Sequence, residues 1–311
     1  MSPRYLTRFA PEYVRNAACD VPYQRLESGL FPGIEVWMRR DDLIDPLISG
    51  NKAFKLVYNI QRMREQGLDG IVTCGGAWSN HIHATAAAGR RFGFKTSAII
   101  RGERGEKLSA MLQDAVRLGM ELHFVSRQQY RERNSHGFLR AIGLCDRKTW
   151  FVPEGGANHE GFEGVVLLGE VIRETAPVEF DQVWLACGTG LSLAGLQAGL
   201  GRTPVIGIPI LKAGGSIFDQ VGRWPDESNS QIRFKPLRDG YHFGGYAKMK
   251  PALRQFMEEF EAREEIPLDP VYTAKLAYAL HSERLLGKVP AGSKILLLHS
   301  GGMQGRRGLT G

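Results

Sequence analysis

Short apolar runs alternate along the chain with segments of helical periodicity. The apolar runs lie at residues 71–74, 96–100, 122–125, 183–187, 205–208 and 295–298. They are rich in Val, Ile and Leu without strict polar alternation, which is typical of strands buried on both faces of a parallel sheet. Helical spacing of apolar positions occupies residues 54–64, 80–92, 107–118, 161–174, 191–200, 251–261 and 273–286.

This alternation of strands and helices predicts an α/β fold with right-handed crossovers. The 311 residues fit one large domain or two closely packed ones, and two open twisted sheets sharing a cleft would suit this length. Ligands of such folds bind at the carboxyl ends of the strands. We therefore expect the site in the loops that follow Cys74, Cys187 and Leu298.

Composition excludes several classes of protein. Hydrophobic residues make up 43% and charged residues 23% of the chain, as in an ordinary globular protein rather than a disordered or fibrous one. No window reaches the roughly 18 consecutive apolar residues of a membrane span, and the first residues lack the apolar core of a secretory signal. The four cysteines (Cys19, Cys74, Cys145 and Cys187) are widely spaced, which favours a reducing cytoplasm over disulfides or a thiolate metal site.

The basic charge of the chain permits two interpretations. Lys and Arg number 40 against 33 Asp and Glu, a net charge of +7, which would suit nucleic-acid binding. The basic residues are spread along the chain, however, and the densest stretch, residues 127–133, contains Glu132 and forms no known motif. The pattern favours a solvated surface that attracts anionic metabolites, with no nucleic-acid partner.

The first candidate for chemistry is Lys52, in the segment Ser49-Gly50-Asn51-Lys52-Ala53. A lysine directly after Gly-Asn, at the opening of a helix, lies close to the backbone. Lysine is a Schiff-base nucleophile when burial or nearby cations lower its pKa. The alternative is an ordinary solvated lysine at a helix start.

A second candidate is the glycine-bounded loop Gly75-Gly76-Ala77-Trp78-Ser79-Asn80-His81, which leads from a predicted strand into a helix. Ser79 or Asn80 can cap that helix, and its free amides can bind an anion such as a substrate carboxylate. An ordinary helix cap without a ligand is the alternative.

A third loop, Gly188-Thr189-Gly190-Leu191-Ser192-Leu193, combines backbone amides and two hydroxyls at a helix start, which suits a phosphate. It is not a P-loop, because no Gly-Lys-Ser/Thr follows. It is also a poor dinucleotide fingerprint, because Leu193 occupies the third-glycine position and no acidic residue ends the next strand.

Together, a phosphate loop, a carboxylate loop and a lysine describe a pyridoxal-phosphate enzyme that acts on an amino acid. A metal site is not expected. His81 and His83 have the wrong spacing for ligands on one helix face, and His242 and His299 are isolated.

The chain resembles the family of pyridoxal-phosphate-dependent 1-aminocyclopropane-1-carboxylate deaminases and D-cysteine desulfhydrases. The matching motifs are Arg40-Asp41-Asp42-Leu43, Gly50-Asn51-Lys52, Ser79-Asn80-His81, Pro153-Glu154-Gly155-Gly156, Gly188-Thr189-Gly190, Gly244-Gly245-Tyr246, Asp269-Pro270-Val271-Tyr272-Thr273 and His299-Ser300-Gly301-Gly302. They cover nearly the whole chain in collinear order. The resemblance implies a tryptophan-synthase-β-like fold and a homodimer. It also implies a large cofactor-binding domain (residues 1–54 and 158–311) with a small inserted domain (residues 55–157).

The resemblance also assigns roles to individual residues. Lys52 would hold the cofactor covalently and move the substrate's α-proton. Substrate contacts would come from Ser79, Asn80 and His81, with Asn80 also reaching the cofactor ring oxygen. The phosphate would be lined by Gly188, Thr189, Gly190 and Ser192. Tyr246 and Tyr272 would face the substrate.

Thr273 favours one reaction of this family over the other. The resemblance implies that the ring-opening deaminases carry a glutamate here, facing the pyridine nitrogen, whereas the desulfhydrases carry threonine. A hydroxyl leaves the ring a weaker electron sink, which suffices for elimination. We therefore expect α,β-elimination from a small D-cysteine-like amino acid to a 2-oxo acid and ammonia.

Two alternatives remain open: a 1-aminocyclopropane-1-carboxylate deaminase, and a non-catalytic protein that binds pyridoxal phosphate or a metabolite. The chain departs from the family pattern at His83, Ala84, Leu191 and Leu193. These departures are expected to alter the substrate pocket while preserving the cofactor site.

Overall fold

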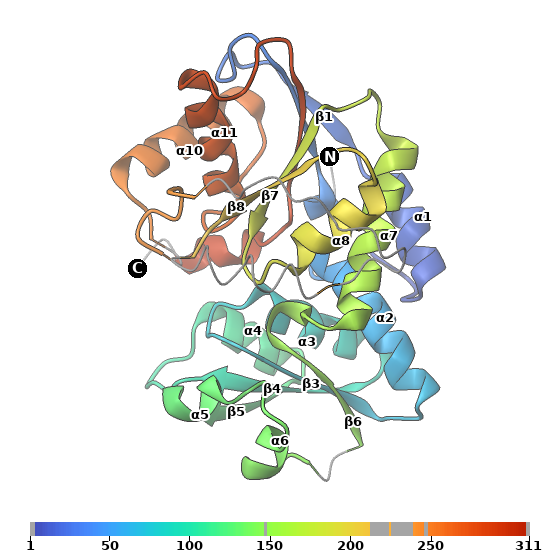
Figure 1. The fold of residues 1–311 in the computed structure, drawn as a ribbon. Coiled ribbons are helices and arrows are strands. Elements are labelled where there is room, and N and C mark those ends of the chain that lie inside the picture. The colour runs from blue at the N-terminus through green and yellow to red at the C-terminus, as the bar shows by residue number, and fades with distance from the viewer. Residues whose placement is uncertain (1–3, 146–147, 212–223, 225–238, 246–247, 309–311) are drawn as a thin grey trace.

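Two mainly parallel sheets, each covered by helices on both faces, make up the computed structural model (Figure 1). The structure describes residues 4–145, 148–211, 224, 239–245 and 248–308. The large sheet has the strand order β1-β2-β9-β7-β8 and the small sheet the order β5-β4-β3-β6. Within them, only the β1–β2 pair is antiparallel.

The elements have the following bounds. The large sheet contains β1 (Tyr23–Leu26), β2 (Glu35–Arg39), β7 (Gln182–Cys187), β8 (Val205–Pro209) and β9 (Lys294–Leu298). The small sheet contains β3 (Gly70–Gly75), β4 (Lys95–Arg101), β5 (Glu121–Val125) and β6 (Thr149–Val152). The helices are α1 (Pro11–Cys19), α2 (Asn51–Glu65), α3 (Asn80–Phe92), α4 (Ala110–Arg117), α5 (Arg127–Arg131), α6 (Phe138–Ala141), α7 (His159–Thr175), α8 (Leu191–Leu200), α10 (Pro251–Glu264) and α11 (Thr273–Leu285).

The α/β fold class with parallel sheets is confirmed, and every strand and helix predicted from the pattern is present. The pattern missed β1 and β6, which are edge strands of mixed polarity with few fully buried positions. It also missed β2, which begins with Glu35 and ends with Arg39. The Arg39 side chain is buried by pairing with Asp41, at 2.9 Å. Among the described residues, no helix is both long and apolar enough to cross a membrane.

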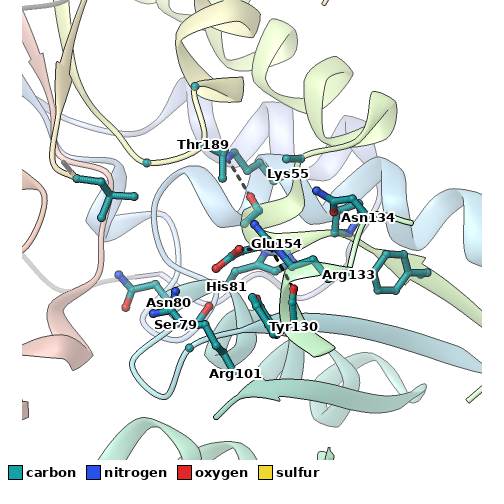
Figure 2. Close-up of a pocket in the computed structure, with 18 of the residues that line it drawn as sticks. Lys55, Ser79, Asn80, His81, Arg101, Tyr130, Arg133, Asn134, Glu154 and Thr189 are labelled. Carbon is teal, nitrogen blue, oxygen red and sulfur yellow. Dashed lines mark hydrogen bonds and ion pairs between the residues drawn. The ribbon is translucent and has the colours of Figure 1, made fainter. Parts of the chain in front are cut away.

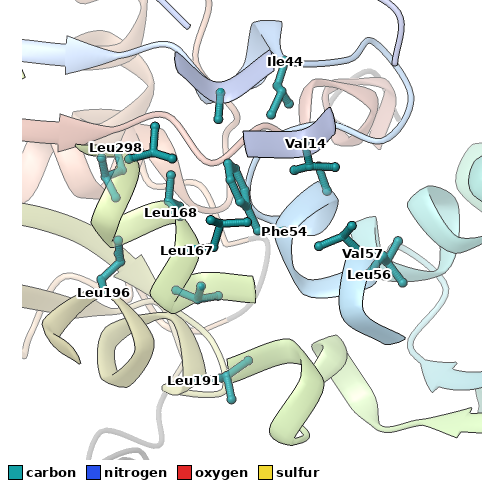
Figure 3. Close-up of a cluster of buried hydrophobic side chains, with 14 of the residues drawn as sticks. Val14, Ile44, Phe54, Leu56, Val57, Leu167, Leu168, Leu191, Leu196 and Leu298 are labelled. Atoms are coloured by element: carbon teal, nitrogen blue, oxygen red, sulfur yellow. The ribbon is translucent and has the colours of Figure 1, made fainter. Parts of the chain in front are cut away.

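Successive residues of the large sheet contribute to different hydrophobic cores. In β7, Val183 and Leu185 join the cluster formed with α2, α7 and α8, whereas Trp184 joins the cluster formed with α10 and α11. Figure 3 shows part of the first cluster, where Phe54 of α2 lies among leucines of α7 and β9. Burial on both faces explains why the strands are continuous apolar runs.

Helices α7 and α8 approach each other so closely that their glycines are in backbone contact. A Cβ on Gly199 of α8 would lie 2.2 Å from the Val166 carbonyl oxygen and 2.8 Å from the Gly169 Cα of α7. Only a residue without a side chain fits there. This contact holds α8, which begins at the predicted phosphate loop, against the rest of the large core.

The small sheet also packs helices on both faces. Ala98 and Ile100 of β4 contact the cluster of α3 and α4, while Val72 and Cys74 of β3 contact the cluster of α5 and α6. All four strands of this sheet fall within the predicted inserted domain, residues 55–157, and the first boundary lies within α2. The division into domains stays a prediction.

The variant Gly199→Ala tests the α7–α8 contact. We expect it to lower the free energy of unfolding by about 1–3 kcal/mol, because the added methyl group overlaps backbone atoms of α7. Urea denaturation followed by circular dichroism would measure the change. Gly105→Ala is the matched control, since the nearest atom to a Cβ there is the Lys107 carbonyl oxygen at 3.7 Å. Equal stability of the two variants would contradict the close contact.

Candidate active site

A cavity of about 1800 Å³ lies where the carboxyl ends of the two sheets face each other. All three loops singled out in the sequence contribute to it (Figure 2). The predicted site residues that line it are Lys52, Ser79, Asn80, His81, Gly188, Thr189, Gly190, Ser192 and Tyr272. Thr273 is fully buried and does not line the cavity, and Tyr246 lies outside the described residues.

The backbone before Lys52 is fixed by a contact that only glycine permits. Gly50 precedes α2 with φ 63°, and a Cβ on it would lie 1.9 Å from the Ser300 carbonyl oxygen. The start of α2 is therefore pressed against the loop that follows β9. This contact sets the position from which Lys52 reaches into the cavity.

Asn51 holds the Lys52 amine and is itself held by Ser192. Its Nζ donates to Asn51 Oδ1 at 2.6 Å, and Asn51 Nδ2 donates to Ser192 Oγ at 3.1 Å. Loss of hydration inside the protein lowers the pKa of Lys52 to about 8, against the opposing effect of the Asp269 carboxylate. A larger fraction of the amine is therefore neutral and nucleophilic near neutral pH. The sequence analysis assigned no role to Asn51.

The phosphate loop leaves the first amides of α8 without a side-chain cap. Gly190, in the left-handed region with φ 82°, is the residue before α8 and has no side chain with which to cap the helix. The first N–H groups of a helix have no partner within it, so they are available to an anion. Gly188 packs against Tyr272, since a Cβ there would lie 3.7 Å from the Tyr272 ring.

Lys55 is a second cavity lysine, which the sequence analysis did not single out. It lies three residues after Lys52, a spacing that puts both side chains on one side of α2. Its Nζ donates to the Gly155 carbonyl oxygen at 3.0 Å, and Figure 2 shows it beside Thr189. Burial and the charge of Lys52 hold the pKa of Lys55 well below its usual value. A bound phosphate would stabilise its charged form.

The carboxylate loop contains polar atoms that lack partners. Ser79 caps α3 by accepting a hydrogen bond from the Ile82 N–H at 3.3 Å. Next to it, Asn80 Oδ1 and both ring nitrogens of His81 are buried, and none of them has a hydrogen-bond partner among the described residues. Burial and the charges of the two lysines keep the pKa of His81 well below its usual value, so the imidazole is neutral. The polar groups of a bound ligand would satisfy these atoms.

Asp269 and Thr273 form the start of α11. Asp269 Oδ1 accepts from the N–H groups of Val271 at 3.1 Å and Tyr272 at 2.5 Å, and burial raises the pKa of this carboxyl to about 7. Its Oδ2 and the Thr273 hydroxyl are buried, with no hydrogen-bond partner in the part of the chain that the structure describes. The sequence analysis listed Asp269 only within a motif, although its charge acts on Lys52.

The family departures lie in different places. His83 is buried away from the cavity, with Nε2 3.6 Å from Asp114 Oδ2, and Ala84 and Leu191 belong to the large hydrophobic core. Leu193 alone of the four lines the cavity. Among the described residues, no group of three His, Cys, Asp or Glu side chains could hold a metal ion.

The residues present fit pyridoxal phosphate. The α8 amides, Ser192 and Lys55 suit its phosphate, and the Lys52 amine suits its aldehyde. The buried atoms of Asn80 and His81 that have no partner among the described residues suit polar groups of a ring and an amino acid. The family of pyridoxal-phosphate-dependent enzymes matches residues 17–301, and the chain belongs to this family. The predicted cofactor is confirmed, and membership of an enzyme family disfavours the alternative of a non-catalytic binding protein.

Individual relatives lie in the subgroup that the sequence resembles. The chain is 28% identical over 301 residues to a bifunctional D-cysteine desulfhydrase/1-aminocyclopropane-1-carboxylate deaminase of Arabidopsis thaliana, covering 89% of this chain and 74% of that protein. It is 27% identical over 323 residues to a D-cysteine desulfhydrase of Klebsiella pneumoniae, covering 97% of each. A solved structure described as an ACC deaminase homologue matches with a TM-score of 0.79 and 29% identity, covering 98% of this chain and 93% of that one.

Cofactor uptake should depend on the protonation of Lys52. We expect the rate at which the cofactor-free chain takes up pyridoxal phosphate to rise with pH and level off above about 8, because the neutral amine is the reactive form. Visible absorption after rapid mixing would measure it. Asp269→Asn removes the charge that raises the pKa of Lys52, so its midpoint should move to lower pH. A wild-type midpoint at the usual lysine value of about 10.4 would contradict the effect of burial.

Proposed function

We propose that this enzyme catalyses α,β-elimination from a small D-cysteine-like amino acid, giving a 2-oxo acid and ammonia. The observation that most supports this proposal is the position of the Lys52 amine in a cavity between a phosphate loop and a carboxylate loop. The pKa of this amine is lowered to about 8. The names of the Arabidopsis and Klebsiella relatives support the same substrate class.

Bound pyridoxal phosphate would supply an electron-withdrawing ring that stabilises negative charge at the substrate's Cα. The chain's own residues would do the rest. Ser79, Asn80 and the amides at the start of α3 would bind the substrate carboxylate, with the neutral His81 beside them. Lys52 Nζ would take the proton from Cα. The phosphate would be held by Gly188, Thr189, Gly190 and Ser192.

Tyr272 would protonate the departing group. Its side chain lines the cavity next to Gly188, so a hydroxyl donor stands close to the cofactor-binding loop. Tyr246 is proposed for the same face of the substrate on the resemblance alone.

The buried Thr273 supports elimination over ring opening. Among the described residues its hydroxyl has no hydrogen-bond partner. The resemblance puts it at the ring nitrogen, where a neutral hydroxyl would stabilise a protonated ring less than a carboxylate would. Elimination needs less of this stabilisation, because the leaving group accepts the electrons as the proton departs. The names of the chain's relatives also favour a second candidate function. This is 1-aminocyclopropane-1-carboxylate deaminase, which would release 2-oxobutanoate.

A homodimer, a cytoplasmic location and the division into a large domain (1–54 and 158–311) and a small one (55–157) belong to the same proposal. The homodimer and the domain division rest on the resemblance. The cytoplasmic location is supported by the wide spacing of the cysteines and by the buried positions of Cys74 and Cys187.

Replacing Lys52 tests the proposed base. We expect Lys52→Ala to lower the turnover of D-cysteine at least about 100-fold, because a positioned proton acceptor is lost. The formation of pyruvate and sulfide would be measured. Lys107→Ala is the control, because Lys107 is exposed and does not line the cavity. Steady-state turnover by Lys52→Ala at the wild-type rate would refute the proposed role.

Replacing Thr273 tests the electron-sink argument. We expect Thr273→Glu to raise the ratio of 1-aminocyclopropane-1-carboxylate opening to D-cysteine elimination, because a carboxylate would favour the protonated ring. Thr273→Gln controls for side-chain size without the charge, and product assays for both substrates give the ratio. If the ratio of ring opening to elimination were equal in Thr273→Glu and Thr273→Gln, the electron-sink argument would be refuted.

A further inference from the structure

The active-site cavity carries more positive charge than the cofactor and a simple amino acid require. Its described lining includes seven basic side chains, namely Lys52, Lys55 and five arginines, against one carboxylate, Glu154. The cofactor phosphate would use Lys55 and the α8 amides, and the substrate carboxylate would use the α3 amides. Of the five arginines, Arg133 is paired with Glu154, and the other four are exposed at the cavity with no role assigned so far.

Arg101 is the arginine beside the carboxylate loop. It is the last residue of β4, whose neighbour β3 leads directly into that loop. A Cβ on Gly76 would lie 3.7 Å from Arg101 Nη2, so the guanidinium lies next to the loop. Figure 2 shows it together with Ser79 and Asn80.

The Arg101 guanidinium has no ionic partner in the part of the chain that the structure describes. Its Cζ lies 6.0 Å from the centre of the Tyr130 ring, a cation–π contact that orients the side chain. Arg133 contacts the same ring from 4.9 Å, but its charge is paired with Glu154 at 2.9 Å. Arg101 is therefore a charged donor at the cavity that is available to a ligand.

We infer that Arg101 binds a second anionic group of the substrate, carried on the β-substituent of the amino acid. The planar guanidinium suits a phosphate, sulfonate or carboxylate, because it can donate two parallel hydrogen bonds to oxygen atoms. This inference rests on the proposed elimination reaction and names a substrate class within it.

The reaction on such a substrate balances without an oxidant or reductant. For O-phospho-D-serine, the Cα proton passes to Lys52 Nζ, and the Cβ–O bond breaks with its electron pair leaving on the phosphate. Water then releases ammonia and pyruvate. Arg101 takes no part in the bond changes; it selects the anionic group and neutralises its charge.

The test compares two D-amino acids that differ in the charge of the β-substituent. O-phospho-D-serine carries an anion, and β-chloro-D-alanine carries a neutral leaving group. We expect Arg101→Gln to raise KM for the phosphorylated substrate about tenfold and to leave KM for the chlorinated one unchanged, because one charge-assisted contact is lost. For the phosphorylated substrate, the KM of Arg101→Lys, which keeps the charge, should lie between those of the wild type and Arg101→Gln.

Arg104→Gln is the matched control, because Arg104 is an exposed arginine three residues later that does not line the cavity. A binding measurement removes the dependence on turnover. In the cofactor-loaded Lys52→Ala variant, calorimetry should show about tenfold weaker binding of O-phospho-D-serine when Arg101→Gln is added, and no change with D-serine.

The outcomes separate the inference from the proposed function. An equal loss for both substrates would mean that Arg101 binds the shared α-carboxylate, and an absence of any effect would mean that it binds neither; both overturn the inference. If the wild type turns over neither amino acid, the elimination reaction is wrong, and the calorimetry alone decides whether Arg101 recognises the second anion.

Discussion

The close approach of Gly50 to the Ser300 carbonyl oxygen is the constraint on which the site depends. The 1.9 Å that would separate a Cβ from this oxygen shows that two backbones, and no side chain, fill the space. On the other side of the same contact, a Cβ on Gly301 would lie 2.4 Å from Ser49 Oγ. The start of α2 and the loop after β9 therefore interlock. The position of Lys52 follows from this backbone packing rather than from its own flexible side chain.

Helix α2, which contains Lys52, also connects the two sheets. Its first turns are part of the large hydrophobic core, and Asn59 lies further along, toward the small sheet. There Asn59 Oδ1 accepts from Trp150 Nε1 of β6 at 2.8 Å and from Asn158 Nδ2 at 2.7 Å, while Asn158 Oδ1 caps α7 by accepting from Gly161 N. Because these amides are mutually satisfied in a largely buried setting, they fix one arrangement of α2, α7 and β6. The cavity between the sheets thus has a rigid wall.

Sequence pattern was informative where a residue's role is local and uninformative where the role arises from burial. The strands buried on both faces and the three glycine-bounded loops could be predicted, because apolar runs and helix starts depend on residues that are adjacent in the sequence. Asn51, Lys55 and Asp269 were not singled out. In isolation each is an ordinary polar residue at a helix start or turn, and only the packing of distant segments makes it a neighbour of the Lys52 amine or of the phosphate loop.

The electrostatics of the cavity connect this packing to function. Two lysines and a histidine lie in surroundings that disfavour their charged forms, and the pKa of each is lowered for that reason. Burial raises the pKa of the nearby Asp269 carboxyl to about 7, so this counter-ion is only partly charged near neutral pH. A dianionic phosphate and a substrate carboxylate would favour the charged forms of these groups, because each anion would offset the cost of burying a cation. The same burial that raises the neutral fraction of the Lys52 amine therefore favours the binding of anionic ligands in the cavity.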